Sequence, residues 1–125
     1  TRHHFCANIV TGPTDVAAAV LIRAGEVVDG VELARARRGG VADAQLARGP
    51  ANLAKALGIT VDDLGADVFA SGSVRLGAAP TERPAIASGP RVGVSKAADV
   101  PWRFWIDGDR SVSLYKRSPR APLTR

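Results

Sequence analysis

Two apolar runs near the start of the chain predict a pair of buried strands. The first covers residues 5–10 and the second covers residues 16–24. Residues 11–15, which are rich in turn-forming side chains, separate the two runs. We therefore expect two short buried strands joined by a turn at this end of the chain.

The middle of the chain has the pattern of short helices. Apolar positions and glycine stops predict helices over residues 31–38 and 49–57, with a helical turn at 42–48. Thr60, followed by two aspartates, is a good N-cap for a further turn. These segments predict two or three short helices.

The later part of the chain has the pattern of short strands. We predict strands at residues 68–69, 74–76 and 91–94. Residues 102–106 and 111–115 alternate apolar and polar side chains around an Asp-Gly-Asp-Arg turn, so we expect them to pair as a hairpin. Together the elements predict an α+β domain with a mostly antiparallel sheet.

Two polar residues interrupt the apolar runs of the first strand pair. Asn8 lies inside the first run, and Arg23 lies near the end of the second, after Val-Leu-Ile. A buried polar side chain needs a partner, so both residues are candidates for a functional site. The alternative is a hydrogen-bonded core asparagine and an arginine whose charged end reaches water at the end of a strand.

Composition places the chain among soluble globular proteins. It has 125 residues, 46% of them apolar, and the mean hydropathy is near zero. We expect one domain, without a membrane span or a signal peptide. The single cysteine, Cys6, excludes an internal disulfide and favours the cytoplasm as the compartment.

The basic residues favour a polyanionic partner. The net charge is +5, and residues 101–125 hold six basic and two acidic side chains. Fourteen of the seventeen basic residues are arginine, which binds phosphate in a bidentate manner. Nucleic acid is the simplest such partner, and a merely solvated basic tail is the alternative.

The start of the helix at Gly49-Pro50 is a second candidate for phosphate contact. Free backbone amides at a helix start attract anions, and Arg48 lies next to them. The same Gly-Pro start is also common without a ligand. No phosphate-binding glycine loop, metal-ligand spacing or nucleophile elbow is present in the sequence, and adjacent His3 and His4 would point to opposite faces of a strand.

Five sequence blocks, in the same order along the chain, resemble the alkyladenine (3-methyladenine) DNA glycosylase family and are similar to its actinobacterial members. The blocks are HFCANI (4–9), AVLIRA (19–24), ARGPANLAKALGI (47–59), PRVGV (90–94) and WRFW (102–105). The resemblance covers residues 3–117. We expect residues 1–117 to form the C-terminal part of a glycosylase domain and residues 118–125 to form a basic tail that is ordered only in part.

The resemblance implies a DNA repair enzyme. Such an enzyme flips alkylated or deaminated purines, such as 3-methyladenine and hypoxanthine, out of double-stranded DNA and hydrolyses the N-glycosidic bond. It implies a partly open, barrel-like sheet, no metal, no cofactor, a monomer, and a bacterial cytoplasmic protein associated with the nucleoid. It also implies that the family's N-terminal part, with the general-base glutamate, is not in this chain.

The resemblance also assigns roles to individual residues. Asn8 and His4 match substrate-binding positions, and the asparagine would exclude guanine by clashing with its 2-amino group. Arg23 and the main-chain carbonyl of Val92 match groups that hold the attacking water. DNA contacts fall at four further matching positions, which are His3, Arg48, Gly49 and Arg91.

Two alternatives to catalysis stay open. The chain could bind DNA without releasing a base, because the general-base glutamate is absent from it. It could also be a structural or interaction domain with an incidental basic tail.

Overall fold

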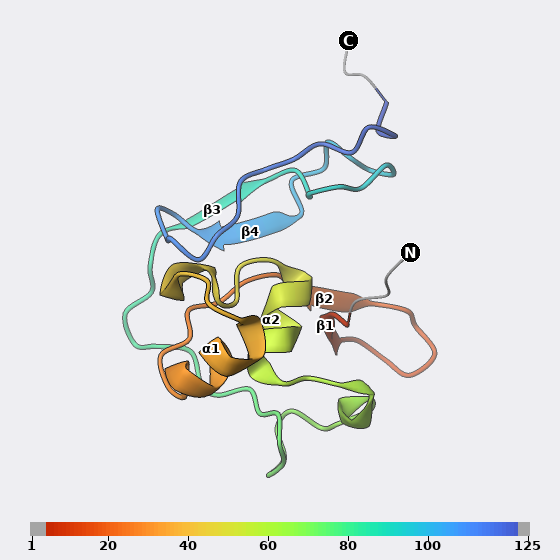
Figure 1. Cartoon of the computed structure of the whole chain (residues 1–125). Helices are drawn as coiled ribbons and strands as arrows, with labels where there is room; N and C mark the ends of the chain where they lie inside the picture. Colours follow the sequence, from red (N-terminus) through yellow and green to blue (C-terminus); the bar gives the residue numbers. More distant parts are fainter. Residues whose placement is uncertain (1–4, 123–125) are drawn as a thin grey trace.

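The computed structural model describes residues 5–122 and has two sheets and two helices (Figure 1). Each sheet has two antiparallel strands. The predicted α+β class is confirmed, with open sheets in one small domain. His3 and His4 lie outside the described residues, so their predicted roles stay predictions.

The first sheet is the predicted strand pair. Strand β1 (Ala7–Val10) pairs with β2 (Ala19–Ile22), and Ala7 lies opposite Ile22. Both strands are shorter than the apolar runs, because the connection widens to residues 11–18 and is closed by Thr11 N–H donating to the Ala18 carbonyl at 3.0 Å. The side chains of Ala7 and Ile22 pack against the core, and their neighbours along each strand face away from it.

Helices α1 (Val31–Arg38) and α2 (Pro50–Leu57) form at the predicted places. Glycines in the left-handed conformation end both helices, Gly39 after α1 and Gly58 after α2. Two single turns accompany the helices, η1 (Asp43–Gln45) and η2 (Val61–Asp63). The second begins at the predicted cap, where Thr60 and Asp63 form a capping box.

The core lies between the helices and the first sheet. Its buried members are three alanines and two leucines, namely Ala34, Leu46, Ala47, Leu53 and Ala56. Leu46 is fully buried. The half-buried Val27, Val31 and Val41 pack against this cluster. The core therefore joins α1, α2 and the first sheet into one unit.

The second sheet differs from the prediction. Strand β4 (Arg103–Ile106) pairs with β3 (Ile86–Gly89), and residues 111–115 form no strand. The Asp109 carboxylate accepts hydrogen bonds from the Ser111 amide at 2.8 Å and the Ser111 hydroxyl at 2.6 Å, which closes a tight turn where the predicted strand would begin. The predicted hairpin of 102–106 with 111–115 is therefore wrong.

Three other predicted strands are also absent from the described residues. Segments 68–69 and 74–76 are joined by one backbone hydrogen bond, from the Leu76 amide to the Val68 carbonyl at 2.8 Å. Residues 91–94 form a turn, not a strand. One isolated bond does not make a ladder, and Phe69 stays 81% exposed, so these short segments have no covered face to hold them.

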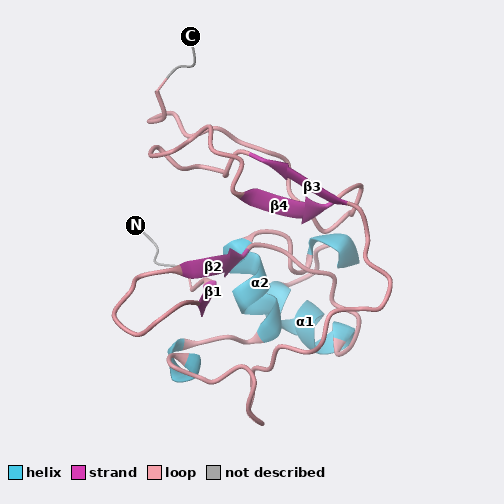
Figure 2. Cartoon of the chain, turned by 180° about the vertical axis from the view of Figure 1, so that it is seen from behind, coloured by secondary structure: helices cyan, strands magenta, loops and turns pink. Residues whose placement is uncertain are grey.

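The connection from η2 to β3 is a long loop. It runs below and beside the helices in both views, and the second sheet lies above them (Figure 2). Within residues 5–122 the longest helices have eight residues, and none is long and apolar enough to cross a membrane.

Candidate nucleic-acid interface

The register of the first sheet places Asn8 and Arg23 on one face. Asn8 lies opposite Leu21 on the face that points away from the core. Arg23 follows Leu21 by two residues, and residues two apart in an extended chain share a face. Asn8 is exposed and Arg23 is half-buried. The two polar residues of the apolar runs are therefore diagonal neighbours on the outer face, and Asn8 is not a core residue.

Arg23 lies in a positive environment. Burial lowers the pKa of Arg23 and the charge of Arg103 lowers it further, while Cys6 acts in the opposite direction. The ion pairs among residues 5–122 involve other arginines, namely Arg35 and Arg117. Arg23 therefore keeps a charge that no carboxylate in the described part neutralises.

Arg103 was not among the residues predicted for the site. Its Nε donates to the Pro90 carbonyl at 2.7 Å, and its guanidinium lies 4.0 Å from the ring centroid of Trp105 and 5.6 Å from that of Tyr115. These contacts hold the guanidinium in place by stacking and a charged hydrogen bond. The signal available in the sequence is the Arg-x-Trp spacing of a strand, which places both side chains on one face.

Arg48 and Gly49 lie next to the strand that continues from Arg23. Ala24 forms an antiparallel bridge with Arg48, and the Gly25 amide donates to the Ala47 carbonyl at 3.1 Å. The Arg48 guanidinium donates to the Arg110 carbonyl, while its Nε is buried without a partner. Arg48 thus links the start of α2 to the loop after β4.

Gly49 precedes α2 in a conformation that favours glycine, with φ of 100°. No side chain caps the helix start, and the Gly49 carbonyl accepts the first helical bond from Leu53 at 2.8 Å. The start of α2 therefore has the open amides that the sequence predicted. Contact with a phosphate there stays a prediction.

Arg91 and Val92 lie on the turn after β3. The Arg91 guanidinium lies 5.3 Å from the Trp102 ring centroid, and one of its nitrogens donates to the Lys96 carbonyl at 2.9 Å. Its Nε is buried without a partner, as is that of Arg48. Val92 is half-buried beside Gly93, whose amide donates to the Lys116 carbonyl at 2.9 Å.

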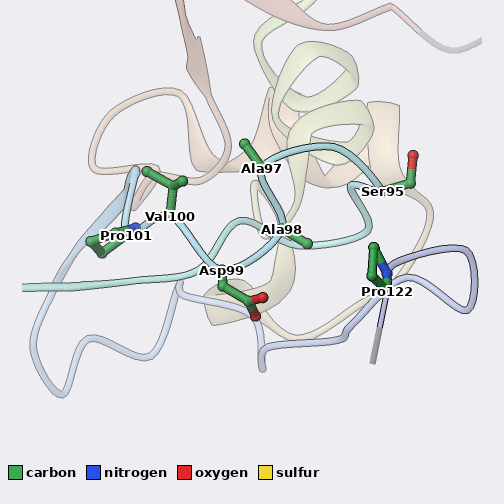
Figure 3. Close-up of a pocket in the computed structure, with 7 residues that line it drawn as sticks. All are labelled: Ser95, Ala97, Ala98, Asp99, Val100, Pro101 and Pro122. Carbon is green, nitrogen blue, oxygen red and sulfur yellow. The ribbon is translucent and has the colours of Figure 1, made fainter. Parts of the chain in front are cut away.

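An open hollow between residues 95–101 and Pro122 lies away from these residues. It has a volume of about 540 Å³, and Figure 3 shows its lining, with Ser95 and Pro122 at one end and Val100 and Pro101 at the other. Its one charged group, Asp99, is already paired with Arg117 at 2.8 Å. This hollow contains none of the predicted site residues. Within residues 5–122, no three His, Cys, Asp or Glu side chains lie close enough to hold a metal ion.

Comparisons with known proteins identify the family. The methylpurine-DNA glycosylase (MPG) family matches residues 1–110. Proteins named "Putative 3-methyladenine DNA glycosylase" are 57% identical in Mycobacterium leprae over 121 residues and 54% identical in Nocardia farcinica over 122 residues. Each match covers 95% of this chain, and 56% and 58% of those relatives.

A third relative of the same name, in Mycobacterium tuberculosis, is 56% identical over 121 residues, which are 59% of its length. The chain thus spans little more than half the length of the curated relatives it matches. A family match over residues 1–110, with relatives this similar, identifies the chain as a member of the methylpurine-DNA glycosylase family.

Proposed function

We propose that this chain provides part of a glycosylase that removes alkylated or deaminated purines, such as 3-methyladenine and hypoxanthine, from double-stranded DNA. The observation that carries the proposal is the outer face of the first sheet, where Asn8 and Arg23 are diagonal neighbours. The family match and the names of the relatives support the same reaction class. One copy would act on each lesion in the cytoplasm, at the nucleoid.

In this mechanism, a damaged purine leaves the base stack and enters a pocket bounded by the outer face of β1 and β2. The Asn8 amide would contact the purine edge and clash with the 2-amino group of guanine, which favours adenine-type lesions. His4, just before β1, would add a contact to the flipped base.

The chemical step replaces one bond by another at the sugar. The oxygen of a water molecule bonds to C1′ while the bond from C1′ to the purine nitrogen breaks, and its electron pair leaves with the base. Arg23 and the carbonyl of Val92 would hold the water, and a carboxylate outside this chain would accept its proton. No metal or cofactor takes part in this scheme.

The proposed DNA contacts come from several elements. Arg48 and Arg91 each use one guanidinium nitrogen on a backbone carbonyl, and arginine has five N–H donors, so donors remain for phosphate oxygens. The open amides after Gly49 and the loop at His3 would add backbone contacts.

Single-turnover release of hypoxanthine from a duplex oligonucleotide tests the activity, with the Mycobacterium tuberculosis relative as the active control. Arg23→Ala should lower the rate by about 10²-fold or more, the size typical for a group that positions reacting species. The matched control is Arg83→Ala, because Arg83 is exposed in the loop before β3 and lies outside the proposed site. No release by the wild-type chain beside an active control would disprove autonomous activity.

A second candidate is DNA binding without catalysis. It is favoured by Arg23 and Arg103, two neighbouring cations without a carboxylate partner for Arg23 in the described part. It predicts no base release and an affinity that falls steeply with salt, with a logarithmic slope of about 0.9 for each phosphate that the protein neutralises. An affinity that is insensitive to salt would count against this second candidate, whereas no DNA binding at low salt would rule out both candidates and leave a structural role.

A further inference from the structure

Arg103 is held at a fixed position on the second sheet. Its Nε donates to the Pro90 carbonyl at 2.7 Å, and its guanidinium lies 4.0 Å from the ring centroid of Trp105. Gly89, which pairs with Arg103 in the sheet, leaves room for both groups, because a Cβ there would lie 3.1 Å from the Trp105 ring and 3.8 Å from Nη2 of Arg103. The orientation of the guanidinium is therefore set before any ligand binds.

The stacking leaves the terminal nitrogens of Arg103 free to bind a ligand. Arginine has five N–H donors, and the Nε bond to Pro90 uses one of them. The ion pairs among residues 5–122 are formed by Arg35 and Arg117, so Arg103 is paired with no carboxylate in this part of the chain. Its remaining N–H groups are available to an anion from outside.

Arg23 lies near Arg103 and is also without a carboxylate partner among the described residues. The chain that leaves β2 after Ile22 runs beneath β4 in both views (Figure 1 and Figure 2). The positive charge of Arg103 acts on Arg23 and is, after burial, the second cause of the lowered pKa of Arg23. The two guanidinium groups therefore face a common region between the first sheet and β4.

Arg48 connects the backbone near Arg23 to the loop that follows β4. Ala24, directly after Arg23, forms an antiparallel bridge with Arg48. On its other side, the Arg48 guanidinium donates to the Arg110 carbonyl in the loop after β4. These two contacts fix the backbone at Arg23 relative to the strand that carries Arg103, so the two cations stay close together.

Two like charges held this close repel each other until an anion binds. The repulsion raises the free energy of the free protein, because both side chains are half-buried and water screens them only in part. One anion between the two guanidinium groups removes the repulsion and accepts charged hydrogen bonds from both. A phosphate group suits this place, since it offers several charged oxygens and arginine binds it in a bidentate manner.

We propose that Arg23 and Arg103 together bind one phosphate group of the DNA backbone, with Arg103 as the fixed member of the pair. The proposal rests on the proposed function for the identity of the ligand, since DNA supplies the phosphate. Arg103 takes no part in the bond changes at C1′. The pair joins the two sheets, so a phosphate bound there would align the DNA backbone with the outer face that carries Asn8.

Inorganic phosphate tests the pair without DNA. The urea midpoint is measured in phosphate and in chloride at equal ionic strength, for the wild type, Arg23→Gln, Arg103→Gln and Arg83→Gln. Arg83→Gln is the matched control, because it removes the same charge from an exposed loop position before β3. We expect phosphate to raise the midpoint of the wild type and of the control more than that of either site variant. An equal rise in all four proteins would overturn the proposal.

The comparison does not depend on equal stability of the variants. Each protein is compared with itself in two salts, so the general stabilisation by phosphate and any loss of structure at Arg103 cancel in the difference. Arg23→Gln provides the second variant, because no ion pair within residues 5–122 includes Arg23.

Binding to a short undamaged DNA duplex tests whether the phosphate belongs to DNA. Arg23→Gln and Arg103→Gln should each weaken binding about tenfold, the loss expected for one charged hydrogen bond, and Arg83→Gln should weaken it less than about twofold. Because the two arginines share one phosphate, the double variant should lower the logarithmic salt slope by about 0.9. A decrease of about 1.8, as for two separate phosphates, would overturn the proposal.

The two experiments separate the failure of this proposal from that of the proposed function. A wild-type chain that responds to inorganic phosphate but does not bind the duplex at low salt would overturn DNA as the ligand, together with the proposed function. A chain that binds the duplex with equal affinity before and after Arg103→Gln would overturn the shared phosphate and leave the proposed function standing.

Discussion

Replacing Gly58 with alanine tests the contact that joins the two helices. Gly58 ends α2 with φ of 67°, and the Arg37 side chain from α1 lies directly over it. An added Cβ would lie 2.7 Å from Cζ and 2.8 Å from Nη2 of Arg37. The Arg37 guanidinium would have to move, and its hydrogen bond to the Ala56 carbonyl, at 3.0 Å, would break.

The expected loss of stability has two parts. An alanine in the left-handed conformation costs about 1 kcal/mol relative to glycine. Loss of a hydrogen bond from a charged donor adds about 1–2 kcal/mol. Gly39→Ala is the matched control, because Gly39 ends α1 in the same conformation with nothing within 4 Å of the added Cβ, so only the first part applies.

Urea unfolding followed by circular dichroism measures both variants. We expect Gly58→Ala to lose about 2–3 kcal/mol and Gly39→Ala to lose about 1 kcal/mol. Arg37→Ala should cost about 1–2 kcal/mol in the wild-type chain and close to nothing beside Gly58→Ala, because the hydrogen bond of Arg37 is then already broken. Equal losses at the two glycines, or full additivity with Arg37→Ala, would refute the reasoning.

Three further predictions concern the core, an ion pair and the stacked arginine. Leu46→Ala should cost about 2–5 kcal/mol in urea unfolding because the side chain is fully buried, whereas Leu64→Ala, at 86% exposed, should change stability by less than about 0.5 kcal/mol. The hydrogen bond from Arg35 lowers the pKa of Asp43 below its ordinary value of 3.8. The pair therefore stabilises the fold above pH 3.8, and this stabilisation is lost as the pH falls through the lowered pKa of Asp43 in the folded state. Asp43→Asn should accordingly make the urea midpoint depend less steeply on pH in the acid range. Arg103→Lys should lower the free energy of unfolding by about 1–3 kcal/mol, because lysine can neither stack its head group on the Trp105 ring nor replace the hydrogen bond from Nε to the Pro90 carbonyl. An unchanged urea midpoint would contradict this prediction.

Several elements were predictable because their signals are local. Apolar spacing predicted the strands around Asn8 and Leu21, glycines after the last turn predicted the ends of α1 and α2, and a hydroxyl followed by two carboxylates predicted the N-cap at Thr60. Each of these signals acts within a few residues of chain, so it needs no knowledge of what packs against the element.

The partner of β4 was not predictable in this way. An Asp-Gly turn favoured a hairpin with residues 111–115, but the turn closes on Ser111, and β4 pairs with residues 86–89 instead. The β3 segment, Ile-Ala-Ser-Gly, has little strand pattern of its own. Its pairing comes from tertiary packing, including the Trp105 ring, which lies 3.1 Å from where a Cβ on Gly89 would be.

The candidate site shows the same division. The sequence alone identified Asn8 and Arg23 as unusual, because polar groups inside apolar runs can be seen without a fold. It did not reveal that both lie on the outer face, since a face depends on register. It also did not reveal Arg103 as the second charge beside Arg23.

The sequence by itself determined the local elements, the basic character and the family blocks of this protein, because each depends on residues close together in the chain. Only the tertiary structure decided which strands pair, which face of the sheet carries Asn8, which backbone carbonyls accept hydrogen bonds from the arginines, and how much apolar surface is exposed to solvent. These properties depend on contacts between residues far apart in the chain, and local spacing carries no information about them.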